Sequence, residues 1–319
     1  MITPAYNVFE FIEEAMTSVM SQSLANFEYI LIDDGSTDGT LAKIERIVAA
    51  DPRVRVVATD HVGASEARNI GLGLAQGKYI AFLDGDDRWY PNFLEEQLSL
   101  LESLDDDVAA VFCRSRIMSE SGRIFFAYWQ RQGQCNLDRM LVESCSPRVG
   151  SSLLIKKRAF DEAGFFETGL QSAQDLEMWL RIQRDSTMPL FWSSSKYLLD
   201  VRRRVGSISG NRSARFAALD KIIMEYAPSM TGTPRGMAFV RAAVFAFRAG
   251  DDLQGDLWAT LAKSAPKLTL LRDNYGRRVL CWSVLDSQRR TSLRRVSKLL
   301  RAAVASVVLP LGACHTSEA

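Results

Sequence analysis

Three carboxylates within four residues follow a short apolar stretch of this 319-residue chain. The apolar residues 79–83 lead directly to Asp84, Asp86 and Asp87. Such a run, bounded by glycine and aspartate, is typical of a strand buried on both faces, and it must end where the charges begin. The carboxylates repel one another, and hard oxygen ligands of this kind suit Mg²⁺ or Mn²⁺. The alternative is an acidic turn in which Asp87 caps the helix that starts at Pro91.

A second apolar run ends in the same way, because residues 28–32 are followed by Asp33, Asp34 and a glycine-rich turn. Strand-like runs and helical periodicity then alternate to about residue 210, with polar residues after each strand. The expected strands are 28–32, 54–57, 79–83, 108–112, 123–129, 151–155 and 197–201. This alternation predicts an α/β fold with a mostly parallel sheet and crossover helices, which binds ligands at the carboxyl edge of its strands.

The bulk composition is that of an ordinary globular protein. Hydrophobic residues make up 47%, charged residues 24%, and the net charge is +1, so composition does not point to nucleic acid. The five cysteines include no C-x-x-C pair, so no zinc motif or disulfide framework is implied and a reducing compartment is expected. Residues 1–7 lack the features of a signal peptide, and no apolar run reaches the length of a membrane span, about 18 residues. We therefore expect a cytoplasmic protein.

Beyond residue 210 the strand signal disappears and apolar residues recur at helical spacing. The chain is therefore expected to consist of an α/β domain over 1–210 and a helical region over 211–319. Within the helical region, residues 294–309 have an apolar stripe with basic residues beside it. A helix of this kind either lies on the inner, anionic face of a membrane or docks on the globular body, and the pattern leaves both open.

Four motifs occur in order along the first part of the chain. They are PAYN at 4–7, DDGSTDGT at 33–40, GASEARNIG at 63–71 and FLDGDD at 82–87. Together they resemble glycosyltransferase family 2, whose members are inverting enzymes with the Rossmann-like GT-A fold, over roughly residues 1–210. The resemblance implies a nucleotide-sugar donor, most often a UDP-sugar, and a bound divalent metal, Mn²⁺ or Mg²⁺.

The resemblance also implies roles for individual residues. The residues that would bind the nucleotide are Pro4, Tyr6, Asp34, Arg68 and Asp84. Asp34 suits the nucleobase because a carboxylate accepts a hydrogen bond from the uracil ring N–H, and Asp84 would hold the ribose. Asp86 would bind the metal, with Asp87 close by. The metal and Arg68 would neutralise the charge that develops on the leaving diphosphate.

Asp175 falls where the family keeps its catalytic base, at the start of a helix expected over 175–184. The family pattern there is Glu-Asp, and Gln174 stands in place of the Glu. A plain helix cap is the alternative for Asp175. Further on, Arg202 keeps an arginine of a later family segment, which implies a phosphate contact, and Arg204 stands in place of a histidine. The alternative for these arginines is a solvated basic edge.

We therefore expect a metal-dependent inverting glycosyltransferase that acts on a glycan or lipid-linked acceptor in cell-surface or secreted glycan biosynthesis. A non-catalytic member that binds a nucleotide sugar or a partner enzyme is the first alternative. Gln174 favours it, as does the first strand, of which only residues 1–3 precede the PAYN loop. A nucleotidyltransferase is the second alternative, but the glycine-rich, basic phosphate loop of that class is missing near the start of the chain.

Overall fold

The computed structural model describes residues 1–48, 51–128, 130, 132–136, 147, 149–204 and 212–226. The chain divides into two compact units, one of Met1–Met140 with Ser144–Ala218 and one of Leu141–Glu143 with Leu219–Ala319. Nearly all described residues belong to the first unit. The expected amphipathic helix at 294–309 lies outside the described residues, so the helical character of residues 227–319 stays a prediction.

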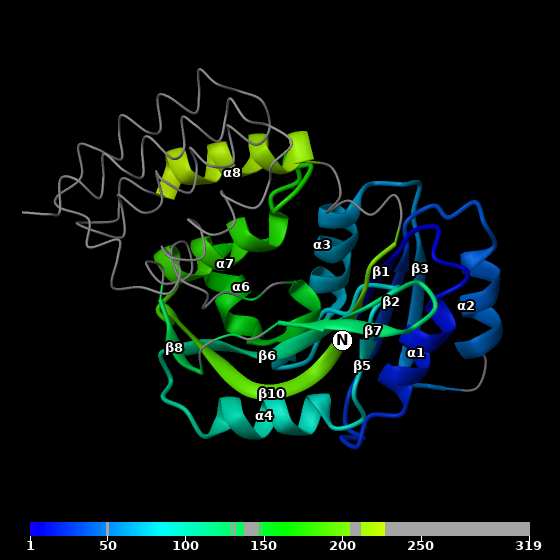
Figure 1. The fold of residues 1–319 in the computed structure, drawn as a ribbon, viewed down its shortest axis with the longest axis horizontal. Coiled ribbons are helices and arrows are strands. Elements are labelled where there is room, and N and C mark those ends of the chain that lie inside the picture. The colour runs from blue at the N-terminus through cyan, green and yellow to red at the C-terminus, as the bar shows by residue number, and fades with distance from the viewer. Residues whose placement is uncertain are drawn as a thin grey trace, which may run out of the picture. The chain divides into compact units, whose positions relative to one another are not determined.

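Strands and helices alternate from the start of the chain, as the sequence predicts (Figure 1). The strands are β1 Ile2–Ala5, β2 Tyr29–Asp33, β3 Val54–Ala58, β4 Tyr79–Ile80, β5 Arg88–Trp89, β6 Val108–Met118, β7 Ile124–Ala127, β8 Gly133–Cys135, β9 Leu153–Lys156 and β10 Leu190–Arg202. The α-helices are α1 Ile12–Met20, α2 Thr40–Val48, α3 Ala64–Leu74, α4 Phe93–Glu102, α6 Lys157–Ala163, α7 Gln174–Asp185 and α8 Arg212–Tyr226. A short 3₁₀ turn, η1 Gly150–Ser152, precedes β9.

Two sheets meet beside the acidic segment. β1, β2 and β3 form a parallel sheet in that order, and the larger sheet follows the order β4-β9-β6-β10-β5. An isolated parallel bridge joins Ile2 to Phe82. Because parallel neighbours end at the same edge, residues that follow β1, β2 and Phe82 gather at one edge of the fold, which is where ligands bind in open α/β sheets.

The first strand extends beyond the three residues expected from the sequence. β1 pairs in parallel with β2 over its whole length, from Ile2 opposite Ile30 to Ala5 opposite Asp33. The Ile2 N–H donates to the Ala81 carbonyl and so points away from β2. Residues two apart in a strand face the same side, so the nitrogen of Pro4 also points away from β2 and its missing N–H removes no hydrogen bond of this pair. Pro4 is therefore part of the strand, and the loop begins two residues later than the motif suggests.

The strands expected at 108–112 and 197–201 are also longer, since they form β6 and β10. These two strands pair in parallel, with Asp200 opposite Arg116. Arg116 Nε donates to Asp200 Oδ1 at 2.8 Å, and Arg88 Nη2 donates to Asp200 Oδ2 at 2.6 Å. Asp200 is fully buried, and its pairing with Arg116 lets β6 continue through a charged residue beyond the apolar run at 108–112.

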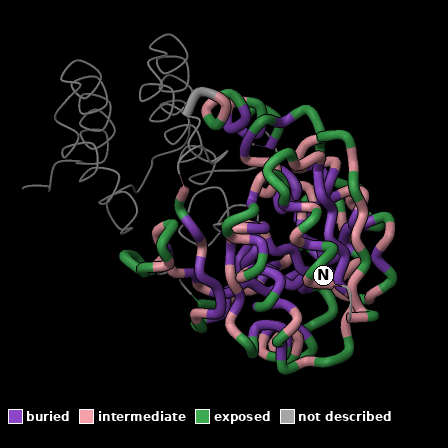
Figure 2. The backbone as a smooth tube through the Cα atoms, turned by 90° about the vertical axis from the view of Figure 1, so that its right-hand side faces the viewer, coloured by how far each residue is buried: buried purple, intermediate pink, exposed green. Residues whose placement is uncertain are grey.

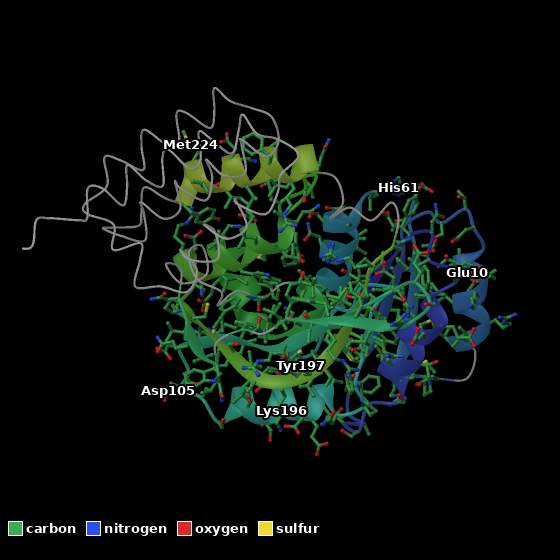
Figure 3. All side chains as sticks on the ribbon, viewed as in Figure 1. Glu10, His61, Asp105, Lys196, Tyr197 and Met224 are labelled. Carbon is green, nitrogen blue, oxygen red and sulfur yellow. The ribbon has the colours of Figure 1, made fainter. Side chains whose placement is uncertain are left out.

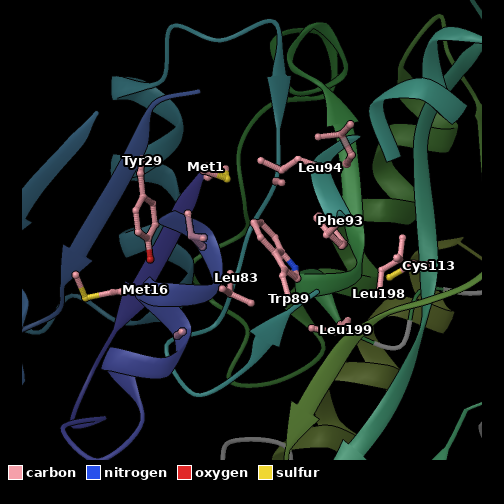
Figure 4. Close-up of a cluster of buried hydrophobic side chains, with 14 of the residues drawn as sticks. Met1, Met16, Tyr29, Leu83, Trp89, Phe93, Leu94, Cys113, Leu198 and Leu199 are labelled. Atoms are coloured by element: carbon pink, nitrogen blue, oxygen red, sulfur yellow. The ribbon is translucent and has the colours of Figure 1, made fainter. Parts of the chain in front are cut away.

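The core lies where α1 and α4 pack against the strands. Trp89 stacks on Phe93 with ring centroids 4.1 Å apart, and Leu83 belongs to the same buried cluster (Figure 4). Burying a side chain of this size stabilises the fold by about 1.5–3 kcal/mol. Figure 2 shows buried residues inside the described part and exposed residues around it. The acidic loop is therefore anchored on both sides, by Leu83 and by Trp89.

Candidate active site

Asp87 is an anchor of the acidic loop. Its Oδ2 accepts a hydrogen bond from Ser151 Oγ at 2.8 Å, and its Oδ1 accepts one from the backbone N–H of Arg202 at 3.0 Å. Burial raises the pKa of Asp87 well above the usual range, and the charges of Asp86 and Asp84 raise it further. The alternative in which Asp87 caps the next helix is wrong, because α4 begins at Phe93 with Asn92 as its N-cap.

Asp86 faces an arginine. Arg204 Nε donates to Asp86 Oδ2 at 2.6 Å. Burial raises the pKa of Asp86 and so does Asp84, while Arg204 opposes the rise. The negative charge at this edge is therefore held close to a cationic side chain from the end of β10.

Arg202 is buried under the acidic loop. Its Nε donates to the backbone carbonyl of Asp86 at 3.0 Å, and its Nη1 donates to that of Glu120 at 2.6 Å. Its Nη2 pairs with Glu14 on α1. The solvated-edge alternative is wrong for Arg202, which is 6% exposed. The contact of Arg202 with a phosphate stays a prediction. Its hydrogen bond to the Asp86 carbonyl holds the acidic loop to the end of β10.

Arg68 lies between two carboxylates. It is buried on α3, and its Nη2 donates to Asp84 Oδ1 at 2.7 Å. Burial alone would lower the pKa of Arg68, but Asp84 and Asp175 raise it. Its Nε is buried without a hydrogen-bond partner among the described residues. The ion pair of Arg68 therefore lies inside the fold, and one buried donor of its guanidinium has no hydrogen-bond partner among the described residues.

Asp175 belongs to the same group. Its Oδ2 accepts a hydrogen bond from the Gly150 N–H at 2.9 Å. Burial raises the pKa of Asp175, with Asp84 adding to the rise and Arg68 opposing it. The capping alternative is wrong, because Ala173 is the N-cap of α7 and Asp175 is already inside the helix. Ala173 has the left-handed backbone φ of 59°, a costly conformation that often occurs at functional sites.

Asp34 and Tyr6 lie together at the ends of β2 and β1. Asp34 accepts hydrogen bonds from Thr59 Oγ1 at 2.9 Å, the Val62 N–H at 2.6 Å and the Gly63 N–H at 2.9 Å. The ring of Tyr6 stacks on His61, with centroids 4.0 Å apart, and Figure 3 labels His61 near the start of α3. Asp34 is almost fully buried, whereas Tyr6 is 41% exposed, so Tyr6 offers the open aromatic surface.

Pro4 connects this group to the acidic loop. The Asp34 N–H donates to the carbonyl of Ala5, next to Pro4, at 2.8 Å. A Cβ atom added to Gly85 would lie 3.5 Å from the Pro4 carbonyl oxygen. The structure thus brings Arg68, Asp84 and Asp175 into one cluster, and places Pro4 beside the loop that carries the acids.

The acids of this edge meet part of what a divalent ion requires of its ligands. No group of three or more His, Cys, Asp or Glu side chains among the described residues is placed to hold one. Asp84 and Asp86 fit a hard cation that takes one or two carboxylates and completes its shell with phosphates and water. The charge of Asp84 raises the pKa of Asp86, and the ion pairs that these two acids form with Arg68 and Arg204 each use a single carboxylate oxygen. Asp87 fits less well, because protein donors reach both its oxygens.

Some contacts of this site carried no recognisable signal in the sequence. Ser151 is expected only as the first residue of a strand over 151–155, and Gly150 and His61 are not among the residues that the sequence predicts for the site. A hydrogen bond from a backbone N–H to a carboxylate does not depend on the side chain of the donor, so the residue type does not predict it. Arg204, in contrast, stands out in the sequence, because it replaces the histidine of the family segment.

The sequence pattern of Glycosyl transferase family 2 matches residues 1–164. The chain belongs to glycosyltransferase family 2. TuaG of Bacillus subtilis (strain 168), named as a teichuronic acid biosynthesis glycosyltransferase, is 30% identical over 214 residues, which cover 66% of this chain and 81% of TuaG. For five rickettsial relatives named as uncharacterized glycosyltransferases, the chain covers 27–59% of their length.

Solved structures confirm the fold predicted for this family 2 member. S. aureus TarS 1–349 in complex with UDP-GlcNAc matches with a TM-score of 0.62 at 16% identity, covering 96% of this chain and 90% of that one. The mannosyltransferase PcManGT from Pyrobaculum calidifontis, in complex with GDP-Man and Mn²⁺, matches with a TM-score of 0.58 at 17% identity, covering 96% and 85%. The α/β body is therefore a GT-A fold.

Proposed function

We propose that the chain is a metal-dependent, inverting glycosyltransferase that moves a sugar from a nucleoside diphosphate donor, first of all UDP, to an acceptor hydroxyl. The observation that carries the proposal is the cluster of Asp175, Arg68 and Asp84 at the carboxyl edge of the sheet. It combines a carboxylate suited to take a proton with a buried arginine whose Nε has no hydrogen-bond partner among the described residues.

Asp175 is the proposed general base. Its carboxylate is oriented by the Gly150 N–H and would remove the proton of the acceptor hydroxyl as that oxygen attacks the anomeric carbon from the face opposite the diphosphate. Attack from that face inverts the anomeric configuration. General base catalysis of this kind contributes about 10²–10⁴-fold to the rate. A raised pKa makes the carboxylate a stronger base, but it also requires a pH at which Asp175 is ionised.

The donor would extend from Tyr6 and Asp34 to the cluster of Arg68, Asp84 and Asp175. Tyr6 and Asp34 would contact the nucleobase, with Pro4 beside them, and Asp84 would hold the ribose. Asp86 would hold the divalent ion, with Asp87 anchoring the loop, and the ion would supply positive charge for the leaving diphosphate. Arg68 adds the charge of its guanidinium on the same side. Arg202 supports the loop through its hydrogen bond to the Asp86 carbonyl. It would contact a phosphate of the donor only if its hydrogen bonds to backbone carbonyls rearranged.

The biosynthetic role and the donor class are inferred from proteins that this chain is similar to. TuaG is named for teichuronic acid biosynthesis, which supports a role in making a cell-envelope polysaccharide on a glycan or lipid-linked acceptor. The solved neighbours carry UDP-GlcNAc, and GDP-Man with Mn²⁺, which supports a nucleotide-sugar donor. Among the described residues, no helix combines the length and apolar character needed to span a bilayer. We propose a cytoplasmic enzyme, in which peripheral membrane contact would come from residues 294–309.

A donor panel tests the proposal. UDP-, GDP- and dTDP-sugars are added with and without Mn²⁺, and the melting temperature is followed, because a ligand of the native state stabilises it by RT ln(1 + [L]/Kd). We expect one nucleotide class to raise the melting temperature in a Mn²⁺-dependent way and to be hydrolysed slowly to the free diphosphate. Binding without hydrolysis would favour the non-catalytic alternative. A chain that no donor stabilises would contradict the proposal.

A further inference from the structure

The turn η1 connects the acidic loop to the proposed base. Ser151 is fully buried in this turn. Its Oγ donates to Asp87 Oδ2 at 2.8 Å and accepts from the Asp84 N–H at 3.1 Å. Its carbonyl oxygen accepts from Trp89 Nε1 at 2.7 Å. One serine therefore holds the beginning and the end of the loop that carries Asp86.

The preceding residue of the same turn holds the base. The Gly150 N–H donates to Asp175 Oδ2 at 2.9 Å. A Cβ atom at this position would lie 3.1 Å from the same oxygen, closer than ordinary van der Waals contact. Two consecutive residues of a buried turn thus contact the Asp175 carboxylate on α7, and the Asp87 carboxylate and Asp84 N–H of the acidic loop.

We propose that Ser151 is a positioning residue that sets the distance between the Asp84–Asp87 loop and Asp175. The inference rests on the proposed function, since it gives that distance a role in placing the cation and the diphosphate relative to the base. A hydroxyl suits the position because it can donate and accept at once. Without it, a buried carboxylate oxygen and a buried N–H would both lose their partner, and the loop would adjust to find others.

The neighbouring Ser152 is a matched control. It is 1% exposed and lies in the same turn. Its Oγ donates to the Val149 carbonyl at 2.9 Å, a bond that stays within the turn and reaches none of the acids. Replacing either serine by alanine removes one hydroxyl from the turn, but only Ser151→Ala also leaves the Asp87 carboxylate and the Asp84 N–H without a partner, so Ser151→Ala should cost more stability. Only the change at Ser151 should disturb the acids.

The experiment compares Ser151→Ala, Ser152→Ala and Ser151→Thr by calorimetric titration with UDP in the presence and absence of Mn²⁺, alongside urea unfolding. We expect Ser151→Ala to weaken Mn²⁺-dependent UDP binding by about tenfold or more, the factor that corresponds to one lost buried hydrogen bond. Ser152→Ala should bind like the parent. Ser151→Thr, which keeps the hydroxyl, should recover most of the affinity.

Three results separate the possible failures. Equal UDP–Mn²⁺ binding by folded Ser151→Ala and Ser152→Ala would overturn the positioning role while leaving the proposed function intact. If Ser151→Ala does not fold, Ser151→Cys replaces it, because a thiol fills the space but is a weak hydrogen-bond donor. Parental binding by the cysteine variant would also overturn the role. A parent protein that binds no UDP would overturn the proposed function and this inference together.

Discussion

Asp34 combines a structural and a proposed binding role. Its carboxylate already accepts from one hydroxyl and two backbone N–H groups of residues 59–63, so it fixes the loop that precedes α3. The N–H of a nucleobase would donate to a carboxylate oxygen of Asp34 that already accepts a hydrogen bond from the protein. This is possible because each carboxylate oxygen has two lone pairs. The proposed base-binding site therefore depends on a residue that the fold itself needs.

Replacing Asp34 by alanine should weaken UDP binding by about 1–3 kcal/mol, because the base loses its carboxylate partner. Thr59→Val is the control, since it removes one of the loop's bonds to Asp34 and keeps the acid. Calorimetry should find near-parental UDP affinity for Thr59→Val. Unchanged affinity in Asp34→Ala would place Asp34 outside the donor site.

The pH dependence of the reaction should reflect Asp175. Burial and the charge of Asp84 raise its pKa above the ordinary value of 3.8. A raised pKa means that the carboxyl group becomes protonated, and inactive as a base, at a higher pH than an exposed aspartate. At saturating donor and Mn²⁺, the kcat for donor hydrolysis should therefore decrease as the pH is lowered. The midpoint of this decrease should lie at a pH above 3.8, the ordinary pKa of an aspartate. An identical decrease in Asp175→Asn would assign it to another group.

Residue identity predicted the acids of the site but not how they are held. Asp84, Asp86 and Asp175 stand out because a charge at the end of an apolar run or at the start of a helix needs an explanation. Ser151 does not stand out, since buried serines are common and its two partners are distant in sequence. Arg202 was interpreted as a surface or phosphate residue because its carbonyl partners, being backbone atoms, are invisible in a pattern.

At the scale of elements, α3 lies closely against β1. A Cβ atom on Gly71 would meet Ile2 Cγ2 at 2.4 Å, whereas a Cβ on Gly73 would meet nothing within 4 Å. Both glycines belong to the same helix. The contact explains why a helix that carries Arg68 toward the site contains a glycine on its buried face.

This pair of glycines provides an internally controlled prediction. Gly71→Ala should destabilise the protein by about 1–3 kcal/mol, the usual cost of overpacking a core. Gly73→Ala should stabilise it by about 0.5–1 kcal/mol, because glycine costs that much in the interior of a helix. Urea unfolding of the two variants gives both numbers. The packing described here would be wrong if Gly71→Ala were as stable as Gly73→Ala.

Element prediction succeeded where apolar periodicity is uninterrupted, as in β2 and β3. It placed the end of β6 too early, because Arg116 lies inside the sheet in an ion pair with Asp200. It placed the start of β10 too late, at residue 197 instead of Leu190. It also missed β5, which has only two residues and pairs with β10. Strand length in these cases depends on partners that only the assembled sheet provides.

At the scale of the whole molecule, every residue proposed for the site belongs to the unit formed by Met1–Met140 and Ser144–Ala218. The GT-A fold could be predicted because its motifs occur in order along this unit. The region beyond residue 226 has a helical pattern but none of those motifs, so its role rests on the amphipathic segment alone.

Deleting residues 290–319 tests that segment. The parent protein should sediment with anionic liposomes, since basic residues flank an apolar stripe at 294–309. The deletion should abolish sedimentation while donor hydrolysis continues, because the proposed site lies elsewhere in the chain. A parent that stays in the supernatant would favour the docked-helix alternative.

The most direct test of the central claim is the rate of donor hydrolysis by Asp175→Asn, measured beside its donor affinity. Asparagine keeps the size of the side chain and an oxygen that can accept from the Gly150 N–H, so the fold and the binding of UDP should persist. It cannot take a proton, so turnover should fall by about 10²-fold or more while the dissociation constant for UDP stays near the parental value. Near-parental turnover in a folded Asp175→Asn protein would contradict the account, because the base would then be another group.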